Sequence, residues 1–305
     1  GHSRRVAMYA TALARAMGCF SEQEIKELEY AAWLHDVGKI GVREHILTKE
    51  NKLFPNQRAQ VCERFQAIKL SIQKQSLEQK FRLIESNASP ERIRALDQKT
   101  DEEIREAQDE LEFVLRIDKP GFMNDEDMKR VDRIARRRFT AADGTRQPWL
   151  TAQEKAALKV RRGNLTEAER KIMNAHVEST YKILSQIPFT RRLRRVPEIA
   201  ASHHEKLDGS GYPHKLRASK IPVQARILAL VDIYDALTAQ DRPYKPAMPV
   251  EKSLDILRFE VKDGHLDPEI FKVFLDNKIY LLEDPGPGAA MGFEQAWPFV
   301  PKSNK

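Results

Sequence analysis

The sequence contains few cysteines, little of the alternation that marks β-strands, and no long apolar run. Its two cysteines, Cys19 and Cys62, are too few for a disulfide framework, which favours a reducing compartment. No apolar run approaches the length that spans a membrane and no signal peptide is visible, so we expect a cytoplasmic protein without a membrane segment. The scarcity of alternating apolar and polar residues argues against a β-rich fold.

Charged residues, by contrast, are abundant. They make up 32% of the 305 residues, and the formal net charge is +7. A positive balance suits an anionic ligand but does not single one out. The length allows one large domain or two small ones.

Helical patterns account for most of the chain outside its loops. Near the start, apolar residues recur at helical spacing at Val6, Tyr9, Leu13 and Met17. Ser21 and Glu24 have the spacing of a capping box, which predicts a second helix that runs to residue 35. Thr166 and Glu169 predict another, which carries His176 and runs toward residue 188. We therefore predict an all-α bundle.

Residues 55–147 have the pattern of an inserted helical hairpin. One apolar stripe contains Val61, Phe65, Ile68 and Ile72 and, after a skip, continues with Leu77, Phe81 and Ile84. Residues 87–90 break the helix, and a second stripe runs from residue 93 to residue 114. Two such helices joined by a short turn predict an antiparallel hairpin. A more basic helix is expected from residue 123 to residue 139.

The hairpin has two interpretations. It is either a structural arm whose helices pack on each other, which we favour slightly, or an element that forms a homodimer or relays a signal. Its charges are of mixed sign, which argues against binding a nucleic acid polymer.

Histidine and aspartate residues on separate segments predict a metal centre. His203 and His204 are adjacent and are followed by the glycine-rich run DGSGYP. A His-Asp doublet ends an apolar helical stretch, and an aspartate interrupts another apolar run, where a carboxylate is costly unless it is paired or binds a cation. Neutral imidazole is a common metal ligand. The candidate ligands are His2, His35, Asp36, His176, His203, His204 and Asp232.

These motifs resemble the HD-GYP domain, a group within the HD superfamily of metal-dependent phosphohydrolases. The resemblance covers roughly the first fifty residues and residues 148–276, in the order of the family. HD alone is a weak signal, whereas HHE, DGSGYP and DALTAQDRPYK together are specific. The matching segments are HSRRV from His2, LHDVGKIGV from Leu34, NLTEAERKIMNAHV from Asn164, HHEKLDGSGYP from His203 and VDIYDALTAQDRPYK from Val231.

The resemblance implies a metal-dependent phosphodiesterase. It assigns metal binding to the seven residues named above, with two or three divalent ions, iron first and manganese as the alternative. Asp36 would bridge two ions, and water activated between them would be the nucleophile. Lys39, Arg242 and Lys245 would hold phosphate oxygens. Gly211 allows close backbone approach, and the Tyr212 ring would pack on a base.

The function expected from this resemblance is hydrolysis of cyclic di-GMP to linear pGpG, and on to GMP. Two alternatives stay open. The same site could hydrolyse another nucleotide such as cyclic GMP-AMP, or the domain could be a non-catalytic cyclic-dinucleotide receptor that signals through its insertion. The expected further partners are a second copy bound through the insertion and a sensory or diguanylate cyclase domain or protein.

The predicted domain organisation has four parts. Residues 1–54 and 148–282 form the two segments of the HD-GYP domain, and residues 55–147 form the helical insertion. Residues 283–305, rich in proline and glycine, form a C-terminal tail.

Overall fold

A computed structural model describes residues 1–239 and 247–283 and confirms the all-α prediction. Within these residues the strands form only two short antiparallel pairs. β1 (Gly121–Phe122) pairs with β4 (Arg162–Gly163), and β2 (Arg138–Thr140) pairs with β3 (Arg146–Pro148). No helix among the described residues is both long and apolar enough to cross a membrane.

The chain divides into two compact units. Unit 1 contains residues 1–39 and the residues from 176 onward, and unit 2 contains residues 40–175. Unit 2 is wider than the insertion predicted for residues 55–147, because side chains on both sides of that range, such as Leu53 and Leu158, share one hydrophobic core with the hairpin. The four predicted domain boundaries remain a prediction.

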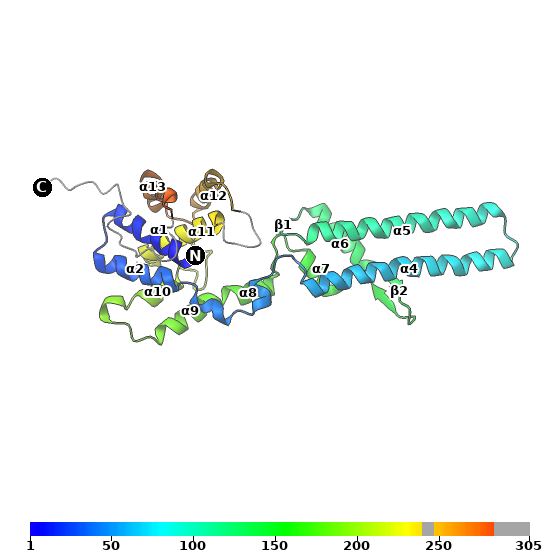
Figure 1. The fold of residues 1–305 in the computed structure, drawn as a ribbon, viewed down its shortest axis with the longest axis horizontal. Helices are drawn as coiled ribbons and strands as arrows, with labels where there is room; N and C mark the ends of the chain where they lie inside the picture. Colours follow the sequence, from blue (N-terminus) through cyan, green and yellow to red (C-terminus); the bar gives the residue numbers. More distant parts are fainter. Residues whose placement is uncertain (240–246, 284–305) are drawn as a thin grey trace. The chain divides into compact units, whose positions relative to one another are not determined.

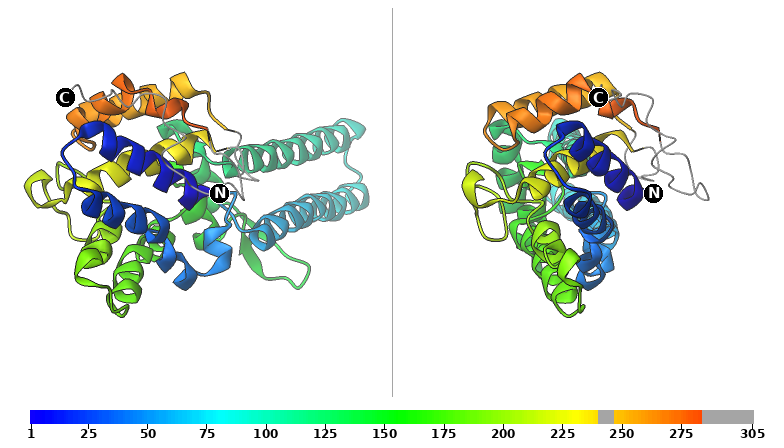
Figure 2. Two further views of the ribbon diagram at one scale, coloured as in Figure 1. Left: turned by 60° about the vertical axis from the view of Figure 1, so that its left-hand side comes forward. Right: turned by 90° about the vertical axis from the view of Figure 1, so that its left-hand side faces the viewer.

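Unit 1 is a bundle in which α1, α2 and α11 lie together at the centre (Figure 1; Figure 2). Its core contains Leu13 of α1, Leu28 of α2 and Leu228 of α11, all fully buried. The helices of the unit are α1 (His2–Met17), α2 (Glu22–Leu34), α9 (His176–Ser185), α10 (Val196–Ala201), α11 (Val223–Thr238), α12 (Val250–Lys262) and α13 (Pro268–Asp276). Its short 3-10 helices are η2 (Arg191–Leu193), η3 (Ala218–Lys220) and η4 (Ile279–Leu281). A fourth, η1 (Val37–Gly41), begins in the residues of unit 1 and ends in those of unit 2.

Capping residues set several helix ends. The Ser21 hydroxyl accepts a hydrogen bond from the Glu24 amide and the Glu24 carboxylate accepts from the Ser21 amide, which confirms the predicted capping box of α2. The Thr166 box also forms, but the helix that it opens does not continue through His176 as predicted. Ala175 caps α8 with ψ at −13°, so α8 ends at residue 174 and α9 begins at residue 176.

Unit 2 is built on the predicted hairpin of α4 (Pro55–Glu85) and α5 (Pro90–Asp118), which run side by side in Figures 1 and 2. Ser76 bonds to Thr100 at 2.6 Å and the Lys80 ammonium binds Asp97 at 2.7 Å, so the two helices also pair through polar groups. The other helices of the unit are α3 (Glu44–Leu47), α6 (Asp125–Arg136), α7 (Ala152–Leu158) and α8 (Glu167–Asn174).

The continuation of the first hairpin stripe was predicted wrongly. Val61, Phe65 and Ile68 are fully buried against α5 and the base of the unit, as expected. Leu77, Phe81 and Ile84 are not on that face, because the skip after Ile72 moves them around the helix. Their exposed fractions are 57%, 68% and 55%.

Candidate metal centre

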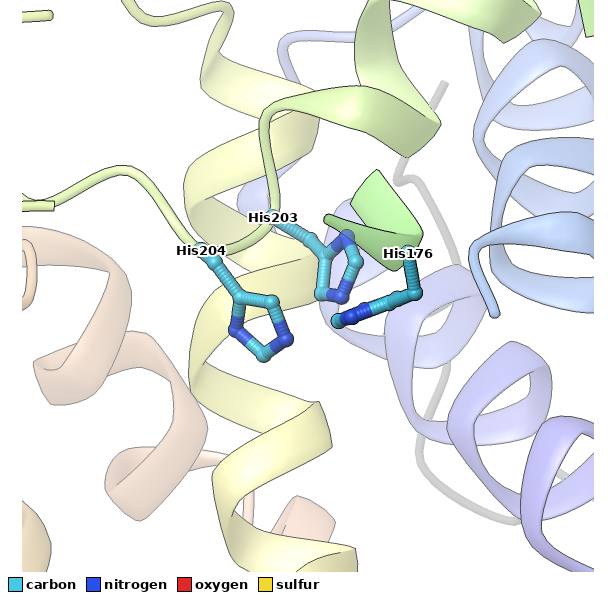
Figure 3. A group of neighbouring side chains, drawn as sticks. All are labelled: His176, His203 and His204. Atoms are coloured by element: carbon cyan, nitrogen blue, oxygen red, sulfur yellow. The ribbon is translucent and has the colours of Figure 1, made fainter. Parts of the chain in front are cut away.

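Five separate segments of unit 1 bring the seven predicted ligands together. His2 begins α1, His35 and Asp36 follow α2, His176 begins α9, the His203–His204 pair follows α10, and Asp232 lies on α11. Three groups of three have ligand atoms within 4.8 Å of one another, and one of them, His35, Asp36 and His203, connects the other two. The first group is His176, His203 and His204, whose rings converge in Figure 3, and the second is His2, His35 and Asp232.

The Asp36 carboxylate lies between the two groups. Its Oδ1 is 3.4 Å from Nε2 of His176, in the first group. Its Oδ2 is 3.5 Å from Nε2 of His35 and 3.7 Å from Nε2 of His2, in the second group. One carboxylate oxygen therefore faces each group, which is the arrangement that a bridging ligand needs.

Hydrogen bonds on the outer ring nitrogens aim these imidazoles inward. Nδ1 of His35 is 2.7 Å from the Ala32 carbonyl, and Nδ1 of His203 is 2.6 Å from the Ala200 carbonyl. A carbonyl oxygen only accepts, so Nδ1 of each ring carries the proton and Nε2 presents a lone pair to the cluster. Backbone acceptors of this kind commonly orient metal-binding histidines.

His2 is oriented by a side chain instead. Its Nδ1 is 2.7 Å from Oδ2 of Asp235, a carboxylate that is fully buried on α11. Asp235 also accepts from Arg5, at 2.6 Å from Nε and 3.1 Å from Nη2. Asp235 lies nearly one helical turn after Asp232, a spacing that allows it to support the same site. The sequence contains no signal for Arg5, whose helical spacing from His2 is compatible with any surface residue.

The protonation of the groups differs with their surroundings. Burial lowers the pKa of His204 to about 4 and also lowers the pKa of His203, so both imidazoles are neutral at pH 7. Burial also acts to lower the pKa of His2, but hydrogen bonds with Asp232 and Asp235 outweigh burial and raise this pKa to about 9. Burial acts to raise the pKa of Asp36 and of Asp232, but their histidine neighbours outweigh it and hold the pKa of each carboxyl well below its usual range.

A glycine and a threonine hold the His-Asp turn against α9. Gly38 is so close to α9 that a Cβ atom there would collide with the His176 carbonyl and the Thr180 amide. The buried Thr180 hydroxyl accepts from the Gly38 amide at 3.0 Å and donates to the His35 carbonyl at 3.0 Å. These contacts fix His35 and Asp36 relative to His176. Thr180 was not found from the sequence, since its spacing on the helix is that of an ordinary core position.

The glycine-rich loop folds back onto the histidine pair. The buried Glu205 carboxylate accepts from the amides of His214 and Leu216, at 2.6 and 2.8 Å. A Cβ atom at Gly211 would lie 2.6 Å from both the Glu205 Cα and the His204 carbonyl oxygen. The half-buried ring of Tyr212 lies 4.8 Å from the His204 ring. The loop therefore places an aromatic face beside the candidate ligands.

Of the three predicted phosphate-binding cations, one lies within the residues that the structure describes. Lys39 lies in η1, where its ammonium forms an ion pair with Asp36, and its side chain remains 37% exposed. It lies in a 3-10 helix and not on a continuous α-helix from His35. Arg242 and Lys245 lie outside the described residues.

Comparison with known sequences agrees with this geometry. Two sequence profiles, each described as an HD domain, match residues 1–119 and residues 152–270. Together they cover most of the chain and contain all seven candidate ligands. The chain is a member of the HD domain family. Its HHE and GYP motifs place it in the HD-GYP group.

This HD-GYP domain is similar to several characterised phosphodiesterases. It is 40% identical over 122 residues to 3'3'-cGAMP-specific phosphodiesterase 3 of Vibrio cholerae, covering 40% of this chain and 25% of that protein. It is 39% identical over 114 residues to a cyclic di-GMP phosphodiesterase of Thermotoga maritima, covering 37% and 30%. With the cyclic di-GMP phosphodiesterase response regulator RpfG of Xanthomonas campestris it shares 41% over 119 residues, covering 39% and 31%. The chain thus spans about a quarter to a third of the length of these relatives.

The residues of this HD-GYP domain fit the metal dependence of HD domains. Nε2 of His203 is buried and has no hydrogen-bond partner among the residues that the structure describes. A buried lone pair without a donor is costly unless a cation takes it up. The donor set of imidazoles and carboxylates is compatible with several transition metals.

Proposed function

We propose that this HD-GYP domain is a metal-dependent phosphodiesterase that hydrolyses cyclic di-GMP to linear pGpG, and further to GMP. The observation that carries the proposal is the position of Asp36, with one carboxylate oxygen toward each of two three-residue groups. Such pairs of sites suit the in-line displacement of a phosphodiester. The relatives named above as cyclic di-GMP phosphodiesterases support this substrate.

The proposed centre holds two divalent ions, one in each group, with Asp36 as the shared ligand. A third ion would need donors in addition to these seven. We propose iron as the metal, with manganese as the alternative, because both accept imidazole and carboxylate donors. Ions bound there would supply Lewis acidity to the attacking water and to the phosphate oxygens.

The chain's own residues bind and orient the substrate. The partly exposed Lys39 ammonium lies beside Asp36, so it can neutralise a non-bridging phosphate oxygen at the centre. Tyr212 offers a ring next to His204 on which a guanine base can stack. Gly211 keeps the loop backbone tight beneath that ring. Further phosphate contacts from Arg242 and Lys245 are proposed from the sequence alone.

The proposal is tested by measuring cyclic di-GMP hydrolysis and metal content in the same purified sample. We expect turnover in the wild type and its loss in the His35→Ala and Asp36→Ala variants, together with reduced metal content. His45→Ala is the matched control, because His45 is exposed and outside the candidate groups. A fully metal-loaded protein that binds cyclic di-GMP without turnover would instead make the domain a receptor.

The second candidate substrate is 3'3'-cyclic GMP-AMP, because a relative from Vibrio cholerae is named as specific for it. Both dinucleotides carry the same phosphodiester ring, and they differ in one base. Parallel measurement of kcat/KM for the two substrates decides between them. A higher value for cyclic GMP-AMP would replace the proposed substrate and leave the proposed chemistry intact.

We also propose that a sensory or diguanylate cyclase domain, attached or separate, controls the activity. The support is that the chain matches only part of each relative, one of which is named a response regulator. Addition of such a domain, fused to the chain or supplied separately, should change kcat, and identical rates would contradict the proposal.

A further inference from the structure

The tip of the α4–α5 hairpin exposes a continuous row of large apolar side chains on α4. We call this row the outer stripe. Its exposed fractions are 64% for Leu70, 57% for Leu77, 68% for Phe81 and 55% for Ile84.

The outer stripe is separate from the face that binds α5. The inner face of the same segment pairs with α5 through Lys69, Ser76 and Lys80, whose polar atoms bond to Gln108, Thr100 and Asp97. With 100° between successive residues, Leu77 lies about 100° around the helix from Ser76. The stripe therefore has no covering element within the residues that the structure describes.

The spacing of the outer stripe is that of a helix-packing seam. Leu70, Leu77 and Ile84 are seven residues apart, and Phe81 stands four residues after Leu77. A seven-residue repeat of apolar residues packs best against another helix. The four side chains present about 400 Å² of exposed apolar surface, in the range of functional patches on single proteins. Doubled in a self-association, it approaches the smallest specific interfaces, so a weak dimer is expected.

Charges beside the stripe select the orientation of the second helix. Lys74 and Glu78 lie on the same flank of the stripe, where they form an i,i+4 ion pair at 3.9 Å and remain 70% and 53% exposed. In an antiparallel pair of α4 helices, each flank faces the same flank of its partner. If the pair is centred on Leu77, Lys74 of one copy lies about 3 Å along the axis from Glu78 of the other. Each Lys74 then faces the second Glu78 in addition to its own, and the two ammonium groups flank the two Glu78 carboxylates, which are also about 3 Å apart along the axis.

A parallel pair lacks this complementarity. The Lys74 flank would then face the opposite flank of the second helix, where Gln66 and Gln73 stand. Lys69 and Lys80, the cations on that side, are already bound to Gln108 and Asp97 of α5. Antiparallel association also places Leu70 against Ile84 and Leu77 against its own copy, while Phe81 lies level with Gln73 of the second helix.

We propose that the outer stripe binds a second copy of this chain, helix α4 against helix α4, antiparallel and centred on Leu77. The proposal is independent of the chemistry at the metal centre, because every residue that carries it lies in unit 2.

The oligomeric state of the intact chain is the first test, by analytical ultracentrifugation from about 1 to 100 μM, the range expected for a small interface. The wild type should shift from monomer to dimer, and the double variant Leu77→Gln, Phe81→Gln should remain monomeric. Phe259→Gln is the matched control, since Phe259 is 64% exposed on α12 and outside the stripe. A wild type that stays monomeric up to 100 μM, or dimers that survive the double variant, would overturn the proposal.

Cysteine crosslinking tests the orientation, in a background where Cys19 and Cys62 are replaced. Leu70→Cys protein mixed with Ile84→Cys protein should form a disulfide-linked dimer. Leu70→Cys alone should not, because two copies of residue 70 would be about 20 Å apart in the antiparallel pair. Crosslinking of Leu70→Cys alone would show a parallel pair and refute the model of the interface.

Exchange of the charges at residues 74 and 78 tests whether Lys74 of one copy lies near Glu78 of the other. Lys74→Glu should weaken the dimer several-fold because it brings four carboxylates together. Lys74→Glu, Glu78→Lys should restore it, because the cross-pairs reform with their signs reversed. Failure of the double exchange to restore association, with helicity unchanged by circular dichroism, would contradict the antiparallel arrangement.

Discussion

At the scale of the residue, Asp235 acts on the candidate centre through another side chain. It receives the Nδ1 proton of His2 on one oxygen and the Arg5 guanidinium on both, so that Nε2 of His2 faces Asp232 at 3.3 Å. An outer carboxylate of this kind orients a metal-binding imidazole and increases its basicity.

Replacement of Asp235 should therefore weaken metal binding without removing a ligand. We expect Asp235→Asn to lower metal affinity by about 10- to 100-fold, because the amide carries no charge for Arg5 and holds His2 less firmly. The measurement is chelator competition on folded, gel-filtered protein. Asp255→Asn serves as the control, since that carboxylate is 61% exposed and pairs with Arg258. Equal affinity in wild type and Asp235→Asn would show that His2 is positioned by its helix alone.

Gly211 is required for steric reasons. A methyl group there would meet the Glu205 Cα and the His204 carbonyl oxygen, which belong to the backbone and cannot rotate away. We expect Gly211→Ala to lower the free energy of unfolding by about 1–3 kcal/mol and to impair substrate binding. Urea denaturation measures the first effect. Gly121→Ala, where the added methyl group meets nothing within 4 Å, should leave stability nearly unchanged.

At the scale of the element, α8 is anchored by one glutamate with two roles. The Glu169 carboxylate caps the helix through the Thr166 amide and binds the almost fully buried Lys49 ammonium at 2.7 and 2.8 Å. Burial acts to raise the pKa of Glu169, but the bonds from Lys49 and Thr166 prevail and lower it. The ionised form is therefore the one that stabilises unit 2.

This lowered pKa predicts a pH-dependent effect of Glu169→Gln. Above the ordinary glutamate value of 4.5 the native carboxylate is ionised, and its loss should cost about 1–3 kcal/mol. As the pH falls through the lowered native pKa, wild-type Glu169 is protonated too, and the difference between the proteins should disappear. Urea denaturation at pH 7 and pH 3 checks this. A difference of equal size at both values would mean that the ion pair contributes nothing.

Helix ends were predicted well where a local hydrogen bond defines them. The Ser21 and Thr166 capping boxes need only four neighbouring residues, so the sequence contains all the information. The break at Ala175 was not predicted, because it depends on what the helix packs against, and a pattern of apolar residues does not name its partner. The position of Leu77 on another face of α4 follows from the five-residue skip after Ile72, which the predicted stripe did not take into account.

At the scale of the whole molecule, the candidate centre joins segments more than 200 residues apart in sequence, from His2 to Asp232. Unit 1 packs clustered imidazoles and carboxylates into its interior, and a bound cation would compensate for their burial. Binding of metal to the folded state alone would stabilise the unit by mass action.

Metal removal should therefore lower the thermal stability of the chain. We expect a chelator to lower the Tm of metal-loaded wild type, by an amount that grows with chelator strength, and metal restoration to recover both Tm and hydrolysis. The His203→Ala variant should begin with a lower Tm and respond less to the chelator. A Tm that does not change in wild type after its metal has been removed would show that the cluster is stable without a cation.

The sequence by itself determined the all-α class, the capped helix starts and the set of candidate ligands, because each is written in residue type and short-range spacing. Tertiary structure decided the rest. It placed Asp36 between two groups of ligands and put Arg5 and Thr180 behind them. These features depend on how distant segments pack, and packing is a property of three-dimensional contacts that no local pattern contains.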